Sequence, residues 1–210
     1  MKKLLIATGN PGKLEDYRKI FENFRIDINL VSLKDLEIKN NFKEDGATFE
    51  ENSKNKAEFY GKLSGFTTLA DDSGIEIDYL GGEPGVKSRR WPGYEASDEE
   101  LIALTLKKME GVSEKERGAQ FRAIISIFFP EKNKNYIFEG IARGIISYKV
   151  SKETIKGYPY SSVFYLPQEK KYFSELNFTP HRNEAIKKAI PIIKKYLSGT
   201  KNPPSILQTN

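Results

Sequence analysis

The sequence predicts an α/β fold, in which a mixed sheet with flanking helices forms one elongated, two-lobed domain with a central cleft. An apolar run at 3–7 is followed at once by a loop and a helical pattern, the order of a strand, a turn and a helix. Farther along, the segments 119–129 and 136–148 alternate as two long antiparallel strands do. A chain of 210 residues can bury one full core. We therefore expect one domain over 1–197 and a polar, mobile tail over 198–210.

The first predicted strand ends in a loop with the sequence Thr-Gly-Asn-Pro-Gly-Lys at 8–13. Apolar residues then recur at helical spacing from 14 to 24, so a helix directs its N-terminal amides and positive dipole end toward the loop. Short polar side chains, glycines and a lysine at that place favour the binding of an anion such as phosphate. The alternative is an ordinary strand-to-helix turn, since short glycine loops are common and the spacing of a P-loop is absent. The candidate contacts are Thr8, Gly9, Asn10 and Lys13.

A second helix is expected to begin near Phe49, because Thr48 and Glu51 have the spacing of a capping box. Glu44 precedes that helix in a charged loop, where its side chain is free to turn inward. A single glutamate in such a loop is usually solvated, so this residue alone does not establish a site.

Two adjacent carboxylates, Asp71 and Asp72, follow the apolar segment 67–70, which we expect to be a short buried strand that ends there. Another strand is expected over 75–80. Like charges this close raise one another's pKa, so the pair indicates a bound cation or a base. Magnesium suits the site, because it prefers carboxylates, water and phosphates, and the chain has no cysteine and one histidine. The alternative is a plain turn, since Asp-Asp-Ser-Gly is turn-prone in any protein.

Three further elements complete the predicted fold. A helix capped by Ser97 or Asp98 has a packing role, and a short strand covers 163–166. Apolar residues at helical spacing predict a closing helix over 183–197, in which Pro191 predicts a kink or a break.

These pieces follow one another in the order that is typical of one enzyme family. The ordered set is Thr8-Gly9-Asn10 with Lys13, Glu44, Thr48-Phe49 with Glu51-Asn52, Lys56-Ala57, Ala70-Asp71-Asp72-Ser73-Gly74, Leu80-Gly81-Gly82 with Pro84-Gly85-Val86, and His181-Arg182. Over roughly the whole chain, the sequence resembles the inosine triphosphate pyrophosphatase family, also called the non-canonical purine NTP pyrophosphatases or HAM1-like proteins. The resemblance implies a magnesium-dependent hydrolase that cleaves ITP, dITP or XTP to the monophosphate and pyrophosphate, usually as a homodimer.

The resemblance also implies roles for individual residues. Asp72 matches the acid that activates water, and Lys56 matches a second lysine near the phosphates. The implied catalytic residues are Asp72, Lys13 and Lys56, the metal ligands are Glu44, Asp72 and Asp71, and the substrate contacts are Thr8, Gly9, Asn10, Lys13, Ser73, Tyr158, Tyr160, Ser161, His181 and Arg182. The chemistry agrees, because cleavage of a triphosphate needs metal and lysine to neutralise charge and a base to orient water.

The segment that would recognise the base departs from the family pattern. Where the family has Gly-Phe-Gly-Tyr-Asp-Pro, this chain has Gly-Tyr-Pro-Tyr-Ser-Ser at 157–162. Tyr158 keeps the aromatic platform, but Ser161 replaces an acid. A hydroxyl donates or accepts hydrogen bonds whereas a carboxylate only accepts, so a pyrimidine or broad preference is an alternative. His181 could be a structural residue at a helix start, but its pairing with Arg182 favours a contact with base or phosphate.

Composition limits the classes of function. The absence of cysteine excludes a disulfide framework and thiolate metal sites and fits a cytoplasmic location. No apolar stretch approaches the roughly 20 residues that span a bilayer, so we expect no membrane association. The net charge of +5 suits phosphate-bearing substrates, but the basic residues are spread among acids, which does not favour nucleic acid as a partner. A nucleotide-binding protein that has lost catalysis is the remaining alternative.

Overall fold

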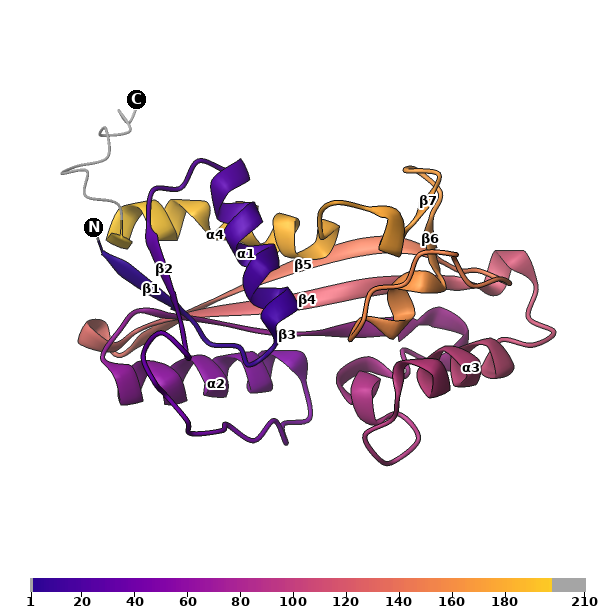
Figure 1. Ribbon diagram of the computed structural model, residues 1–210, viewed down its shortest axis with the longest axis horizontal. Helices are drawn as coiled ribbons and strands as arrows, with labels where there is room; N and C mark the ends of the chain where they lie inside the picture. Colours follow the sequence, from indigo (N-terminus) through magenta and orange to yellow (C-terminus); the bar gives the residue numbers. More distant parts are fainter. Residues whose placement is uncertain (1, 198–210) are drawn as a thin grey trace, which may run out of the picture.

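A seven-stranded mixed sheet runs along the elongated molecule (Figure 1). The computed structural model describes residues 2–197. The strands are β1 (Lys3–Ile6), β2 (Asn29–Ser32), β3 (Thr68–Ile77), β4 (Gly118–Phe129), β5 (Lys134–Ile146), β6 (Phe164–Leu166) and β7 (Lys171–Tyr172). The helices are α1 (Pro11–Asn23), α2 (Phe49–Ser64), α3 (Asp98–Lys108) and α4 (Pro180–Leu197). In the order β2-β1-β3-β4-β5-β6-β7, β1 is parallel to both of its neighbours and the other pairs are antiparallel. The predicted α/β fold is therefore confirmed.

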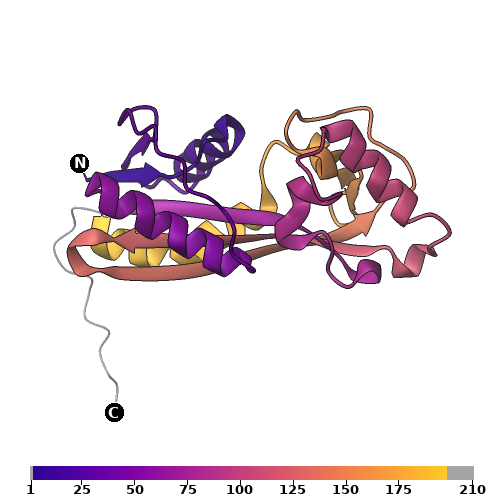
Figure 2. The same ribbon diagram turned by 90° about the horizontal axis from the view of Figure 1, so that it is seen from below.

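The long strands β3, β4 and β5 join two lobes. The first lobe contains β1, β2, α1 and α2, and the second lobe contains α3, β6 and β7 (Figures 1 and 2). In the first lobe, α1 and α4 pack on one face of the sheet, where Phe21 and Ile186 meet Leu69. Helix α2 covers the opposite face, where Ala57 meets Ala70. The second lobe has a core of its own, to which α3, β4, β5 and β6 contribute.

Strand β3 differs most from the sequence prediction, because it is one strand of ten residues rather than two short strands. All of its residues pair with β4, and Asp71 lies opposite Ile125 while Asp72 lies opposite Ile124. The prediction that a strand ends at the two aspartates was wrong, since the long antiparallel partner supplies hydrogen bonds throughout the turn-prone sequence. Successive side chains of a strand point to opposite faces, so the two aspartates lie on opposite sides of the sheet.

The predicted starts of α1, α2 and α3 are confirmed. Asn10 caps α1 and Thr48 caps α2, each through a side-chain oxygen that accepts from backbone amides of the first turn. Ser97, not Asp98, caps α3 with a complete capping box. In α2 the carboxylate of Glu51 accepts from the amide of Ala47 at 2.9 Å, so its return contact lies one residue farther out than in a capping box.

Helix α4 starts earlier and runs longer than the sequence predicts. It begins at Pro180 and continues through Pro191, so of the predicted kink or break the structure excludes the break. A proline removes one hydrogen bond of the helix. Ala189 and Ile193, on either side of it, are fully buried against the sheet and hold the helix in place. The predicted mobile tail at 198–210 lies outside the described residues.

The described part of the chain also shows whether any of its helices could span a membrane. Across residues 2–197, no helix has both the length and the apolar character needed to cross a bilayer.

Candidate active site

A cavity of about 560 Å³ lies between the two lobes and contains most of the predicted site residues. A volume of this size is typical of a small-molecule site. The predicted residues that line it are Asn10, Lys13, Glu44, Asp72, Ser73, Tyr158, Tyr160, His181 and Arg182. Those that do not are Thr8, Gly9, Lys56, Asp71 and Ser161. Lys13 and Asp72, which lie far apart in the sequence, thus face the same space.

The loop before α1 is held by its own side chains. The hydroxyl of Thr8 accepts from the amide of Asn10 at 3.1 Å. The side-chain oxygen of Asn10 accepts from the amides of Gly12 at 2.8 Å and Lys13 at 3.3 Å. Two of the helix amides that the sequence directs toward an anion are therefore already capped. The loop still presents a positive charge to the cavity, because Lys13 lines it. A Cβ added at Gly9 would meet no atom within 4 Å, so packing does not require a glycine there.

Asp71 holds the basic residues of the site together. Its carboxylate accepts from Nζ of Lys13 at 2.9 Å, the hydroxyl of Tyr17 at 2.7 Å and Nε of Arg182 at 2.7 Å. Its backbone carbonyl accepts from Nζ of Lys56 at 2.6 Å. Burial alone would raise the pKa of Asp71, but the charges of Lys13 and Arg182 outweigh it and hold the pKa well below its usual range. Asp71 is therefore a permanent anion.

Asp72 is the aspartate that faces the cavity. Its carboxylate accepts from Nδ2 of Asn52 at 2.9 Å and from the backbone amide of Ser73 at 3.0 Å. Burial raises the pKa of Asp72, and the negative charge of Glu44 adds to this rise against the lowering effect of Lys13. A carboxylate with a raised pKa is a better proton acceptor than an ordinary one. The two neighbouring aspartates thus have pKa shifts of opposite sign, which is typical of groups with different catalytic roles.

Glu44 lies beside this aspartate and is fixed by two basic residues. Nζ of Lys56 forms an ion pair with the Glu44 carboxylate. Nη2 of Arg90 donates to the Glu44 carbonyl at 2.9 Å. Lys56 is buried behind Glu44 and does not line the cavity, so its contacts are with the protein.

Glu44 and Asp72 are the carboxylates that fit a divalent cation. Within residues 2–197, no group of three or more His, Cys, Asp and Glu side chains is arranged to hold a metal. Magnesium typically uses one or two carboxylates and completes its coordination with water and substrate phosphates, so this pair fits its requirements. The carboxylate of Asp71 accepts from three protein donors on the other face of the sheet, which does not favour its predicted role as a ligand.

Two tyrosine rings also line the cavity. Tyr158 and Tyr160 line it, and the hydroxyl of Tyr160 donates to the carbonyl of Ser88 at 2.5 Å. Ser161 is fully buried, and its hydroxyl donates to the carbonyl of Tyr158 at 2.6 Å. The serine that replaces the acid of the family pattern thus directs its hydroxyl at the backbone rather than into the cavity.

His181 lies at the start of α4 and also lines the cavity. Its imidazole stacks on Phe121 with ring centroids 5.4 Å apart. Within the described residues, its Nδ1 has no hydrogen-bond partner. Burial and the positive charge of Arg182 lower the pKa of His181 well below its usual range, so the ring is neutral.

Arg182 connects several parts of the site. Its Nε donates to Asp71 at 2.7 Å, its Nη1 to Asp16 at 3.2 Å and its Nη2 to the hydroxyl of Ser73 at 2.9 Å. Protein acceptors therefore engage all three nitrogens of the guanidinium.

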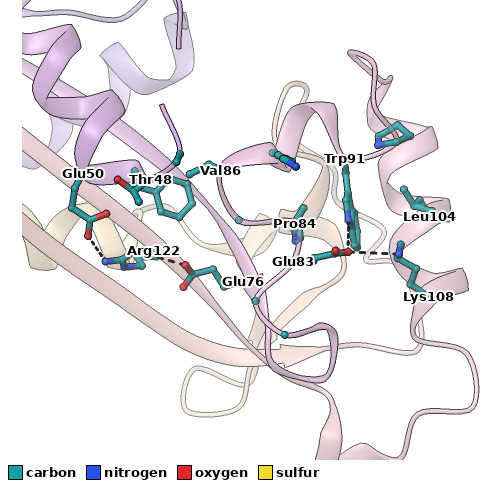
Figure 3. A pocket seen from close by; sticks show the side chains of 17 residues that line it. Thr48, Glu50, Glu76, Glu83, Pro84, Val86, Trp91, Leu104, Lys108 and Arg122 are labelled. Atoms are coloured by element: carbon teal, nitrogen blue, oxygen red, sulfur yellow. Dashed lines mark hydrogen bonds and ion pairs between the residues drawn. The ribbon is translucent and has the colours of Figure 1, made fainter. Parts of the chain in front are cut away.

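A second cavity of about 680 Å³ lies near the start of α2 and beside Trp91 (Figure 3). Among the described residues, its charged side chains other than Lys87 form ion pairs. Arg122 contacts the carboxylates of Glu50 and Glu76, and Lys108 lies 3.7 Å from the carboxylate of Glu83. None of the predicted site residues lines this cavity. The cavity between the lobes is therefore the candidate active site.

Comparison with known proteins agrees with the order of the motifs. The model of the Ham1 family matches residues 4–192. The chain belongs to the Ham1 family. A dITP/XTP pyrophosphatase of Bacillus licheniformis is 37% identical over 193 residues, which cover 90% of this chain and 96% of that protein. The predicted family resemblance is therefore confirmed.

Solved structures of other Ham1 proteins have the same fold. The HAM1 protein of Coxiella burnetii matches with a TM-score of 0.80 and 28% identity, over 93% of this chain and 100% of that chain. The Ham1 protein of Staphylococcus aureus matches with a TM-score of 0.78 and 33% identity, over 92% and 99% of the two chains.

Three residues of this Ham1 site were not among the sequence-based candidates. Asp16 and Tyr17 contact Arg182 and Asp71, and Asn52 contacts Asp72. Helical spacing could have indicated Asp16 and Tyr17, because they lie three and four residues after Lys13 and so share its helix face. Asn52 belongs to the quoted family motif, which gave it no role of its own.

Proposed function

We propose that this Ham1 protein hydrolyses non-canonical purine nucleoside triphosphates, namely ITP, dITP and XTP, to the monophosphate and pyrophosphate. The main support is that Lys13 and Asp72 face one cavity that Tyr158 and Tyr160 also line. A lysine suits the triphosphate, a carboxylate of raised pKa suits a water molecule, and aromatic rings suit a base. The name of the Bacillus licheniformis relative, dITP/XTP pyrophosphatase, supports the same choice of substrates.

Two positive groups would neutralise the negative charge of the triphosphate, namely Lys13 and a bound Mg²⁺. Lys13 supplies a positive charge at the start of α1, and Asp71 fixes its position through the 2.9 Å contact. Glu44 and Asp72 would hold Mg²⁺, which when bound would neutralise phosphate oxygens and polarise the phosphorus centre. Lys56 holds Glu44 at the rim of the cavity. Catalysis here depends on positioning and charge more than on covalent chemistry.

Asp72 is the proposed general base. It accepts the proton of the attacking water as the bond between the α and β phosphoryl groups breaks and pyrophosphate leaves. Its raised pKa brings the carboxylate closer to the range in which a base accepts a proton readily. Asn52 and the amide of Ser73 fix the orientation of its two oxygens.

A second candidate function is the same reaction with a pyrimidine or broad base preference. It is favoured by Ser161, whose hydroxyl is turned to the carbonyl of Tyr158, so that this position offers the cavity neither an acid nor a hydroxyl. Recognition of the base then depends on the groups that line the cavity.

The experiment is a pyrophosphate-release panel with ITP, dITP, XTP, GTP, ATP, UTP and dTTP, run with and without magnesium. We expect ITP, dITP and XTP to lead and turnover to require magnesium. Comparable rates with UTP or dTTP would favour the second candidate. Intact triphosphates throughout would favour the alternative of a nucleotide-binding protein that has lost catalysis.

Two variants test whether Asp72 is the general base. Asp72→Asn is expected to lower kcat at least about a hundredfold without changing the fold. Asp45→Asn is the matched control. This aspartate follows Glu44 in the chain, but it is exposed, and among the described residues it pairs only with Lys43 at 3.4 Å. Full activity of Asp72→Asn would overturn the assignment.

The family resemblance further supports a cytoplasmic homodimer. Light scattering of the purified full chain would test the dimer, and a monomer at all concentrations would contradict it.

A further inference from the structure

Tyr158 reaches across the cleft from the second lobe to α1 in the first lobe. Its hydroxyl donates to Oδ2 of Asp16 at 3.4 Å. Its ring lies directly on the first turn of α1, because a Cβ added at Gly12 would come within 2.9 Å of Cε2 and 3.0 Å of the hydroxyl oxygen. The loop between β5 and β6, which carries Tyr158, thus makes both a polar and a steric contact with the opposite lobe.

The same oxygen of Asp16 is also an acceptor for Arg182. Nη1 of Arg182 lies 3.2 Å from it, and the guanidinium lies 5.8 Å from the centroid of the Tyr158 ring. Arg182 continues to Asp71 and Ser73 through its other nitrogens. The carboxylate of Asp16 therefore connects the loop that carries Tyr158 with Arg182 at the start of α4, and through Arg182 with Asp71.

The hydrogen bond of the Tyr158 hydroxyl differs from the others of its loop. Other hydrogen bonds of the same loop stay within the second lobe. The amide of Gly157 donates to Asp98 at 2.6 Å, and the hydroxyl of Ser161 donates to the carbonyl of Tyr158. The contact with Asp16 is of a different kind, since it crosses the cavity in which the nucleotide is proposed to bind.

We propose that the Tyr158 hydroxyl and Asp16 form a latch across the cleft, which holds the loop over the cavity and keeps Arg182 directed at Asp71 and Ser73. Asp16 and the Tyr158 hydroxyl have a positioning role, because they act on the site through Arg182. The proposal rests on the proposed function only for the identity of the cavity's occupant; the latch itself is a property of the protein without ligand.

Hydrogen exchange of the full chain without nucleotide tests the latch directly. Tyr158→Phe keeps the ring and removes the hydroxyl, so we expect amides of the loop at 150–160 and of the first turn of α1 to exchange about threefold to tenfold faster. Exchange in β4 is expected to stay unchanged. Unchanged exchange at the loop would overturn the proposal, and so would an equal increase in β4, which indicates a general loss of stability.

Tyr148→Phe is the matched control. The hydroxyl of Tyr148 donates to the carbonyl of Val112 at 3.3 Å, a bond of similar length that stays within the second lobe. We expect its loss to leave exchange at 150–160 and at α1 unchanged. An effect equal to that of Tyr158→Phe would contradict a latch.

A double-mutant cycle with Tyr158→Phe and Asp16→Ala tests the coupling. Each single variant is expected to lower kcat for ITP more than it raises KM, and the double variant is expected to lose no more than Asp16→Ala alone. Additive losses would contradict the latch. If the wild-type protein cleaves no triphosphate, the proposed function fails, but the exchange experiment still decides for or against the latch.

Discussion

Asp71 and Asp72 are neighbours in β3, but their side chains serve opposite faces of the sheet. Asp71 accepts from Lys13, Tyr17 and Arg182, whereas Asp72 faces the cavity between the lobes. One strand thus supplies a permanent anion that orders the basic residues and, at the next position, a carboxylate that is free to accept a proton. The alternation of a β-strand produces this separation without a change in the backbone.

Replacing Asp71 with asparagine is expected to destabilise the protein strongly. Asp71→Asn leaves the buried charge of Arg182 and the amine of Lys13 without their common partner, and breaking a buried pair in this way costs about 3–5 kcal/mol. Urea denaturation measures the loss. Asp78→Asn is the control, because its ion pair with Arg143 is half exposed and is expected to contribute at most about 1 kcal/mol. Equal losses for the two variants would contradict the central role of Asp71.

The stability difference between wild type and Asp71→Asn is expected to depend on pH in one direction. The pKa of Asp71 is well below 3.8, the ordinary value that it regains in the unfolded chain. A lowered folded-state pKa contributes stability that is present above the unfolded pKa and is lost as the pH falls through the folded one. Urea denaturation from pH 8 to pH 5 should therefore give a constant difference, which shrinks only below about pH 4. A difference that already falls between pH 7 and pH 5 would contradict the pKa shift.

The sequence predicted the start of α1 better than it predicted the extent of β3. The start of α1 follows from local signals, since Asn10 and the apolar spacing after it lie within a few residues of one another. The continuity of β3 depends instead on β4, where Ile124 and Ile125 lie about fifty residues farther along the chain. Local turn propensity cannot reveal such a partner, and tertiary pairing overrides it. Likewise, helical spacing places Asp16 and Tyr17 near Lys13 but does not reveal that this helix face meets Asp71 and Arg182.

The pKa of Asp72 is expected to fall when Glu44 loses its charge. Burial raises this pKa most, and the negative charge of Glu44 raises it further. In Glu44→Gln, removal of the like charge favours the ionised form of Asp72. A carboxyl titration by NMR without metal measures the change. An unchanged or higher pKa in Glu44→Gln would contradict the coupling.

Arg117 is expected to be essential for the stability of the second lobe. Its guanidinium is buried and donates to the carbonyls of Ile146 at 2.6 Å, Met109 at 2.7 Å and Ser147 at 3.1 Å. Arg117→Met fills much of the same volume but removes the Arg117 donors from these carbonyls, of which that of Met109 still accepts from the amide of Val112 at 3.3 Å. Each carbonyl that is left buried without a donor costs about 1–3 kcal/mol. Denaturation by urea measures the effect, with Arg143→Met as a half-exposed control that should change stability by less than about 1 kcal/mol. A stability equal to that of the wild type would show that water satisfies the carbonyls.

Ser161 is expected to have no direct part in base recognition, although it occupies the position of an acid in the family pattern. Its hydroxyl donates to the carbonyl of Tyr158 at 2.6 Å, and its side chain does not line the cavity. Ser161→Ala should therefore lower the free energy of unfolding by about 1 kcal/mol, the contribution of one hydrogen bond, and leave the ratio of kcat/KM for XTP and ITP within about twofold. Ser162→Ala is the control, because the hydroxyl of Ser162 donates at 3.0 Å to the carbonyl of Pro159 and is equally buried. Pyrophosphate release with both nucleotides measures the ratio. A change of about tenfold or more in Ser161→Ala alone would mean that the hydroxyl turns into the cavity when the base binds.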